Sequence, residues 1–215
     1  LEPYRVLDLT QDRGMLCGQV LADLGADVIQ IEPPGGARGR ELAPFVTHPD
    51  GSRESLTWLG YTRGKRCLEL DLAVEKKQFL DLVRRADVLI EAETVGIMSE
   101  MGLGYTDLSK VNPALIYVSI TPYGLDGPKA KWHASDLTLV AAAGPMALTG
   151  DQDRPPVRVT VPQAWQHAAA EAFTGTLIAL HERTQSGLGQ HVYVSAQQAL
   201  TLATQGNILS AAVGE

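Results

Sequence analysis

Six short runs rich in β-branched residues recur along the chain, and most of them end at a carboxylate, a proline or a glycine. Stretches with helical periodicity separate most of these runs. Strands that alternate with helices are typical of a parallel sheet whose carboxyl ends line up along one edge and form a ligand crevice. The pattern therefore predicts an α/β fold with a mostly parallel, Rossmann-like sheet and crossover helices. The runs are VLDL (6–9), ADVIQIE (26–32), CLELDL (67–72), ADVLIEA (86–92), LIYVSITP (115–122) and HVYVSA (191–196).

Apolar residues at helical spacing predict the connecting helices. A Ser or Asp cap is expected at Ser135 or Asp136 for a helix that ends at Ala143, and Pro162 is expected in the first turn of a long helix. The stretch 33–61 is rich in glycine and proline and is predicted to be a loop. The other helices are expected at 14–24, 73–85, 95–101 and 197–209, with a single helical turn at 108–111.

Composition narrows the class of protein further. No run approaches the roughly 20 apolar residues of a membrane helix, and a net charge of −7 disfavours non-specific nucleic-acid binding. The local basic cluster at 63–66 fits a small anionic ligand better than a polyanion. Cys17 and Cys67 are predicted to be small core residues rather than a disulfide, which indicates residence in the cytoplasm.

Several common catalytic and binding motifs are missing. The two Gly-x-Gly sequences, at 102–104 and 187–189, do not follow a strand and open a helix with a third glycine, so both are interpreted as turns. The five histidines show no metal-ligand spacing, and no metal site is expected. A hydrolase elbow and a phosphate-binding loop are also absent.

The strongest signal is distributed over five segments. In their order and spacing these segments resemble the family III CoA-transferases (CaiB/BaiF), which include formyl-CoA transferases, carnitine-CoA transferases and α-methylacyl-CoA racemases. The resemblance covers essentially the whole chain and implies the large domain of that fold, here incomplete. The segments are VLDLT (6–10), GQVLADLGADVIQIEPPGG (18–36), TRGKRCLELDL (62–72), RADVLIEAETVGIMSEMGLGYTDLSKVNPALIYVSITPYGLDGP (85–128) and ERTQSGLGQHVYVS (182–195).

Transfer of CoA between carboxylic acids is the chemistry that this resemblance implies. An aspartate attacks the acyl-CoA thioester, and covalent anhydride and thioester intermediates follow. Such proteins are about twice this length and form interlocked dimers. We therefore expect residues 1–215 to be a single N-terminal domain, a fragment or the first part of a longer chain. The expected partners are acyl-CoA and a second CoA-transferase domain or subunit, in a homo- or hetero-dimer, with no tightly bound cofactor.

The nucleophile that the resemblance implies is missing from this sequence. The family's aspartate stands ten residues before a helical glycine, which is Gly175 here, and that position is Trp165. An indole cannot attack a thioester. The histidine that racemases of the family carry corresponds to Ser135, which precedes Asp136. No catalytic residue is therefore assigned.

The CoA cleft is expected to be weakened too. Where the family reads Glu-Asn-Phe-Arg-Pro-Gly, this chain has Glu-Ala-Glu-Thr-Val-Gly at 91–96, and an arginine of related proteins is Glu100 here. Exposed acidic groups of this kind should repel phosphates by about 1 kcal/mol each. Lys65, Arg66 and Arg40 are further possible phosphate contacts, or else ordinary surface charge. The CoA contacts that the resemblance implies are Arg38, Leu70, Leu72, Ala73, Ala92, Glu93 and His133.

Three hypotheses remain open at this point. The chain could be the non-catalytic half of a CoA-transferase whose active half lies in a second domain or subunit. It could instead be a CoA enzyme with a relocated carboxylate, for which Asp136, Asp151 and Asp153 are the candidates. The third hypothesis is a scaffold or binding protein that has lost CoA chemistry.

Overall fold

A six-stranded sheet forms the centre of the molecule. The structure is a computed structural model that describes residues 1–151 and 153–213. The strand order is β5-β2-β1-β6-β7-β8, and each neighbouring pair is parallel. All six predicted strands are therefore confirmed, each within a few residues of its expected ends. The strands are β1 (Arg5–Asp8), β2 (Asp27–Glu32), β5 (Arg66–Glu69), β6 (Val88–Glu91), β7 (Ile116–Thr121) and β8 (His191–Ser195).

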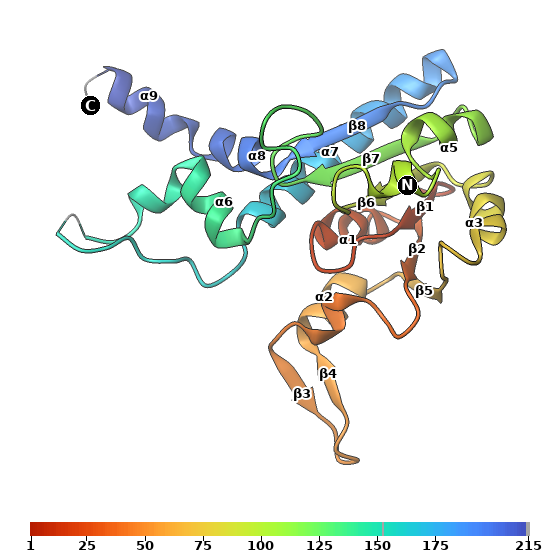
Figure 1. The fold of residues 1–215 in the computed structure, drawn as a ribbon, viewed down its shortest axis with the longest axis horizontal. Helices are drawn as coiled ribbons and strands as arrows, with labels where there is room; N and C mark the ends of the chain where they lie inside the picture. The colour runs from red at the N-terminus through yellow and green to blue at the C-terminus, as the bar shows by residue number, and fades with distance from the viewer. Residues whose placement is uncertain (152, 214–215) are drawn as a thin grey trace.

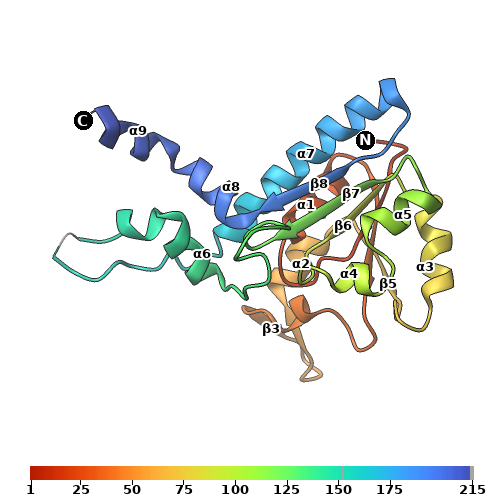
Figure 2. The same cartoon turned by 45° about the horizontal axis from the view of Figure 1, so that its top comes forward.

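Two groups of helices cover the two faces of this sheet. Figures 1 and 2 show α1 and α7 on one face and α3, α4 and α5 on the other. The helix α9 extends away from the sheet beyond α6 and α8 (Figure 2). The helices are α1 (Met15–Asp23), α2 (Leu56–Thr62), α3 (Lys76–Val83), α4 (Ile97–Glu100), α5 (Tyr105–Val111), α6 (Asp136–Ala143), α7 (Ala164–Ser186), α8 (Ala196–Ala203) and α9 (Gln205–Val213), with short 3-10 turns at Arg38–Glu41 and Pro145–Leu148.

Alternation along the strands builds a separate core on each face. Successive strand residues point to opposite sides, so Val6 packs in the core under α1 and α7, while Leu7 packs in the core under α3, α4 and α5. Phe79 is fully buried in the second core. Both faces are covered by helices, which is the usual situation of a parallel sheet.

The strand order reverses between β1 and β6. From β1 the chain proceeds to β2 and β5 on one side, and from β6 to β7 and β8 on the other. At such a switch point the loops that follow the two central strands diverge, and a crevice opens at their carboxyl ends. The Nε2 atom of Gln11, which follows β1, donates to the Oε1 atom of Glu93, which follows β6, at 3.1 Å. This bond spans the switch point and marks where a ligand crevice is expected.

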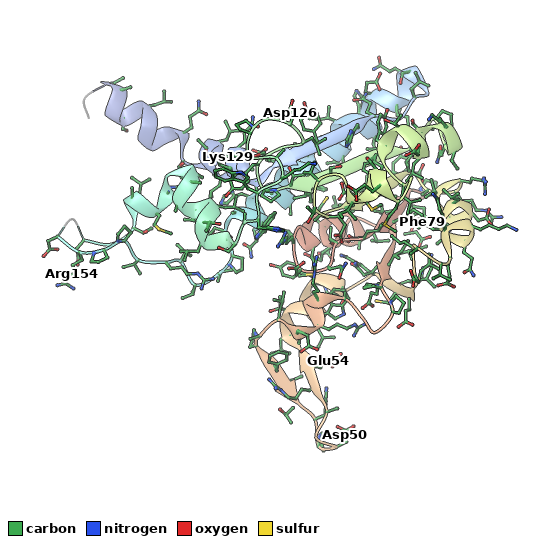
Figure 3. The ribbon with its side chains drawn as sticks, in the orientation of Figure 1. Asp50, Glu54, Phe79, Asp126, Lys129 and Arg154 are labelled. Carbon is green, nitrogen blue, oxygen red and sulfur yellow. The ribbon has the colours of Figure 1, made fainter. Side chains whose placement is uncertain are left out.

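The stretch 33–61, predicted to be a loop, also contains regular structure. This stretch contains the antiparallel hairpin of β3 (Phe45–Thr47) and β4 (Arg53–Ser55), followed directly by α2. Each strand has only three residues, too short for a strand pattern to emerge from the sequence. The Ser55 side chain accepts from the N–H of Trp58 and starts α2. The hairpin extends away from the sheet, with Asp50 at its tip (Figures 1 and 3).

Two smaller predictions also need correction. Pro162 does not lie in the first turn of the long helix, because α7 begins at Ala164 with Gln163 as its N-cap. Cys67 is exposed and not a core residue, since β5 is an edge strand, whereas Cys17 is buried as predicted. In the part of the chain that the structure describes, no helix is both long enough and apolar enough to cross a membrane.

Candidate functional site

The first candidate ligand site, here called the strand-end cavity, lies at the carboxyl ends of β5, β2, β1 and β6. It has a volume of about 400 Å³. Four of the expected CoA contacts, Leu70, Leu72, Ala73 and Glu93, line it. The residues lining it are Leu9, Gln11, Ile31, Pro33, Pro34, Leu70, Asp71, Leu72, Ala73, Glu93, Ile97, Met98 and Met101.

The other three expected CoA contacts do not line the strand-end cavity. Ala92 packs in the core on the opposite face of the sheet, because it is one residue out of phase with Glu91 and Glu93. His133 is exposed in the segment before α6. The Nη2 atom of Arg38 lies 3.2 Å from the Oδ1 atom of Asp12, at the mouth of the crevice.

The charges around this cavity are acidic. Asp71 and Glu93 are the ionisable residues among those that line it, and no lysine or arginine of the described residues does so. CoA carries phosphates, which need cations or N–H donors. The apolar walls suit a pantetheine arm, so the cavity fits that part of CoA better than its phosphates.

Two basic residues proposed as phosphate contacts serve other purposes. The Lys65 side chain is fully buried, and its Nζ atom donates to the Oδ2 atom of Asp8 at 2.6 Å and to the Oε1 atom of Gln30 at 3.0 Å. Arg66 pairs with Asp27, at the start of β2 and therefore at the sheet edge opposite the crevice. The burial of Lys65 contradicts a phosphate contact there, whereas the exposed Arg66 matches the alternative of ordinary surface charge.

The second candidate site, here called the Trp165 cavity, lies beside the first turn of α7. It has a volume of about 580 Å³. The Trp165 side chain forms part of its wall and is 8% exposed, and the guanidinium of Arg13 lies over the indole, 5.1 Å from the ring centroid. The residues lining it are Asp12, Gly14, Met15, Leu16, Gln19, Leu42, Ala43, Pro44, Leu56, Thr57, Gly60, Tyr61, Arg63, Thr160, Val161, Pro162, Trp165 and Gln166.

The two cavities adjoin the same loop. Gln11 lines the strand-end cavity, and the next residue, Asp12, lines the Trp165 cavity. Arg38 contacts both residues, since its backbone N–H donates to Gln11 Oε1 at 3.5 Å while its guanidinium pairs with Asp12. The loop after β1 therefore contributes one residue to each cavity.

One carboxylate does lie at the start of α7. The Oδ1 atom of Asp136 accepts from the backbone N–H of Ala164 at 2.8 Å. Asp136 is itself the first residue of α6, which Ser135 caps as predicted through a capping box with Thr138. Asp136 is only 9% exposed and does not line the Trp165 cavity. Its carboxylate therefore supports the helix end from inside the protein.

A third cavity, of about 250 Å³, brings Glu91 and Glu93 beside Ser119 and His191, and the sequence had not singled out the latter two. The Oγ atom of Ser119 lies 2.9 Å from the Nε2 atom of His191, whose ring stacks on Tyr105. Burial raises the pKa of Glu91 to about 7, and the charge of Glu93 adds to this, while the Ser119 hydroxyl and the N–H of Glu93 oppose it. Because Ser119 and His191 are 72 positions apart, no local motif could have indicated this group.

Possible metal ligands were also compared in position. Within residues 1–151 and 153–213, no three histidine, cysteine, aspartate or glutamate side chains gather so that they could hold a metal ion.

Comparison with known proteins identifies the family. The sequence matches the family model described as CoA-transferase family III over residues 1–215. It is 37% identical over 204 residues to succinyl-CoA:(R)-benzylsuccinate CoA-transferase subunit BbsE of Thauera aromatica, which covers 94% of this chain and 50% of that protein. It is 40% identical over 200 residues to succinyl-CoA:mesaconate CoA-transferase of Haloarcula hispanica, with coverages of 89% and 50%.

Solved structures agree with the sequence matches. The crystal structure of a CAIB/BAIF family protein from Brucella suis superimposes with a TM-score of 0.90 at 34% identity, over 99% of this chain and 57% of that one. The match confirms the mostly parallel α/β fold and, together with the family model, the resemblance noted in the sequence. The chain spans about half the length of the curated relatives it matches.

Proposed function

This chain belongs to the CoA-transferase family III, and we propose that it forms the non-catalytic half of an enzyme that moves CoA between carboxylic acids. The observation that carries the proposal is Trp165. This indole stands in the first turn of α7 and forms the wall of an open cavity, at the position where the resemblance implies a nucleophilic aspartate.

The chemistry of CoA transfer explains why this residue matters. A carboxylate must attack the thioester carbonyl, and donors fixed around it must stabilise the charge that develops. An indole has no nucleophilic oxygen and offers only an N–H donor. Asp136 occupies the same helix end, but it is buried and already accepts the Ala164 N–H. In this proposal the attacking carboxylate comes from a second domain or subunit.

The strand-end cavity supports a retained role in CoA binding. Its walls are mostly apolar, which suits the pantetheine arm, whereas its acidic residues Asp71 and Glu93 disfavour phosphate. We therefore assign the phosphate contacts mainly to Arg38 and to the second half of the enzyme. In this view residues 1–215 form one domain of a larger assembly. The relative from Thauera aromatica is named as a subunit, which is consistent with an enzyme built from more than one chain.

A relocated nucleophile is the second candidate function, and the bond between Asp136 and Ala164 favours it. A carboxylate at a helix start lies where backbone N–H groups can stabilise charge. For Asp136 to react, however, its side chain must leave a buried position and turn into the Trp165 cavity. Asp151 and Asp153 are weaker candidates, because both pair with Arg154, which lies at the outer end of the segment after α6 (Figure 3).

An association assay tests the proposal. The complete polypeptide that carries this sequence is mixed with a homologous subunit that bears the aspartate, and isotope exchange between an acyl-CoA and its free acid is followed. We expect the two proteins to co-elute and the exchange rate to rise above that of either alone. The Trp165→Asp variant should gain exchange activity, whereas Trp132→Asp, at a residue 57% exposed outside both cavities, should not. If the two proteins do not associate and the exchange rate does not rise, the proposal is refuted.

A further inference from the structure

The third cavity lies on the face of the sheet that α4 and α5 cover. Side chains at every second position of a strand point to the same face, and Tyr117, Ser119 and Thr121 of β7 therefore line the cavity together. Thr94 and Ser99 also line it and are exposed, so small solutes reach it from the solvent. Its volume of about 250 Å³ lies below the roughly 300–1,000 Å³ of sites for drug-sized molecules. The cavity therefore suits a ligand with few atoms.

Two carboxyl groups make the third cavity acidic. Glu91, the last residue of β6, is 6% exposed, and its Oε2 atom accepts from the backbone N–H of Glu93 at 2.8 Å. Glu93 lines the cavity as well, and no lysine or arginine of the described residues does so. Burial lowers the pKa of His191, so its imidazole is neutral at pH 7 and adds no positive charge. Because a buried charge needs a partner of opposite sign, the cavity favours a cation over an anion.

The remaining wall suits an organic cation. The ring of His191 stacks on that of Tyr105, with centroids 4.9 Å apart, and Tyr117 meets the His191 ring edge-on at 5.3 Å. Aromatic side chains attract ammonium groups and cover alkyl groups. Among the histidine, cysteine, aspartate and glutamate side chains described, no three lie where they could share a metal ion. An organic cation therefore fits this wall better than a bare metal ion.

The hydrogen-bond acceptors of the cavity match the donors of a primary ammonium group. Such a group has three N–H donors, and each needs an oxygen atom once it leaves water. The carboxylates of Glu91 and Glu93 and the hydroxyl of Ser119 supply oxygen atoms, and Tyr105 and His191 offer rings to a short alkyl chain. Independently of CoA chemistry, we propose that the third cavity binds a small primary amine in its ammonium form.

Ligand-detected NMR titration of the complete polypeptide that carries this sequence tests the proposal. The probes are propylammonium, tetramethylammonium, 1-propanol and propionate, which are similar in size and differ in charge and in N–H donors. We expect propylammonium to bind at least tenfold more tightly than 1-propanol. Tetramethylammonium, which has no N–H donor, should bind more weakly than propylammonium, and propionate should bind most weakly.

Glu91→Gln removes one charge from the cavity and keeps the size of the side chain. The variant should bind propylammonium at least tenfold more weakly. Glu41→Gln is the matched control, because Glu41 is exposed and lines none of the three cavities, and it should leave the Kd unchanged. Urea unfolding verifies that both variants are folded.

The Kd for propylammonium should also depend on pH. Burial raises the pKa of Glu91 to about 7, and the other titratable groups that line the cavity are Glu93, Tyr105, Tyr117 and His191. The neutral forms of Tyr117 and His191 are favoured by burial. Because only ionised Glu91 forms the ion pair, propylammonium should bind up to about tenfold more tightly at pH 8 than at pH 6. Glu91→Gln should abolish this dependence.

Four results would overturn the assignment of an amine site. These are no measurable binding of propylammonium, equal binding of propylammonium and 1-propanol, tighter binding of tetramethylammonium or propionate than of propylammonium, and an unchanged Kd in Glu91→Gln. None of these measurements involves CoA, so the amine site can fail while the proposed function stands.

Discussion

The carboxylate of Asp136 and the backbone N–H of Ala164 form a 2.8 Å hydrogen bond that joins the starts of α6 and α7. This bond fixes the helix end that carries Trp165, the next residue. It also gives a buried donor an acceptor, which the first turn of a helix otherwise lacks. Asp136 thus fixes the position of Trp165, which is 29 residues away in the sequence.

Replacement of Asp136 should show the structural value of this bond. Asp136→Ala removes the acceptor from a buried N–H and should lower the free energy of unfolding by about 1–2 kcal/mol. Asp136→Asn keeps an acceptor oxygen and should cost only a few tenths of a kcal/mol. Urea unfolding of both variants at pH 7 measures the difference. Equal losses for alanine and asparagine would mean that the bond does not stabilise the helix end.

The buried ion pair of Lys65 and Asp8 should be among the most sensitive positions. Lys65→Met leaves the carboxylate of Asp8 without its cation inside the protein, and we expect a loss of about 3–5 kcal/mol. Arg63→Met breaks the exposed pair with Asp23 and should cost about 0–1 kcal/mol. Thermal and urea unfolding compare the two. Similar small losses in both variants would show that Lys65 is accessible to water and free to contact phosphate.

Glu91 should make stability depend on pH. Burial raises the pKa of Glu91 to about 7 from an ordinary value of 4.5, so the unfolded chain ionises first as the pH rises. The folded state keeps its stability below about pH 4.5 and loses it between pH 4.5 and 7, by up to about 3 kcal/mol.

Glu91→Gln cannot ionise and isolates this effect. The variant should match the native protein near pH 4.5 and exceed its free energy of unfolding by up to about 3 kcal/mol at pH 8. Burial also lowers the pKa of His191 in the same cavity, but that contribution is common to both proteins. Urea unfolding from pH 4.5 to 8 measures the difference, and a difference independent of pH would contradict the assignment.

Much of the fold could be predicted because its signals are local. Each parallel strand is a short β-branched run, and the cap expected at Ser135 or Asp136 is found at Ser135, next to the helix that it starts. The hairpin of β3 and β4 was not predicted, because strands of three residues are too short to show a periodic pattern in the sequence. The start of α7 was misplaced by two residues, because its stabilising acceptor, Asp136, belongs to another helix.

The candidate site could be predicted only in part. Leu70, Leu72, Ala73 and Glu93 lie together as the resemblance implies, since they follow the carboxyl ends of β5 and β6. The buried ion pair of Lys65 could not be predicted, because its partner Asp8 is 57 positions away in the sequence. The pairing of Asp12 with Arg38 and of Arg63 with Asp23 likewise depends on how distant segments meet.

Intact-mass spectrometry tests most directly whether this chain lacks a nucleophile. The complete polypeptide is incubated with an acyl-CoA and treated with hydroxylamine or borohydride to trap any acyl or thioester intermediate. Its intact mass is then measured, and any adduct is located by peptide mapping. We predict an unchanged mass for the native protein, and a modified peptide from the start of α7 in Trp165→Asp. A trapped adduct on the native protein, above all on Asp136, would contradict the account.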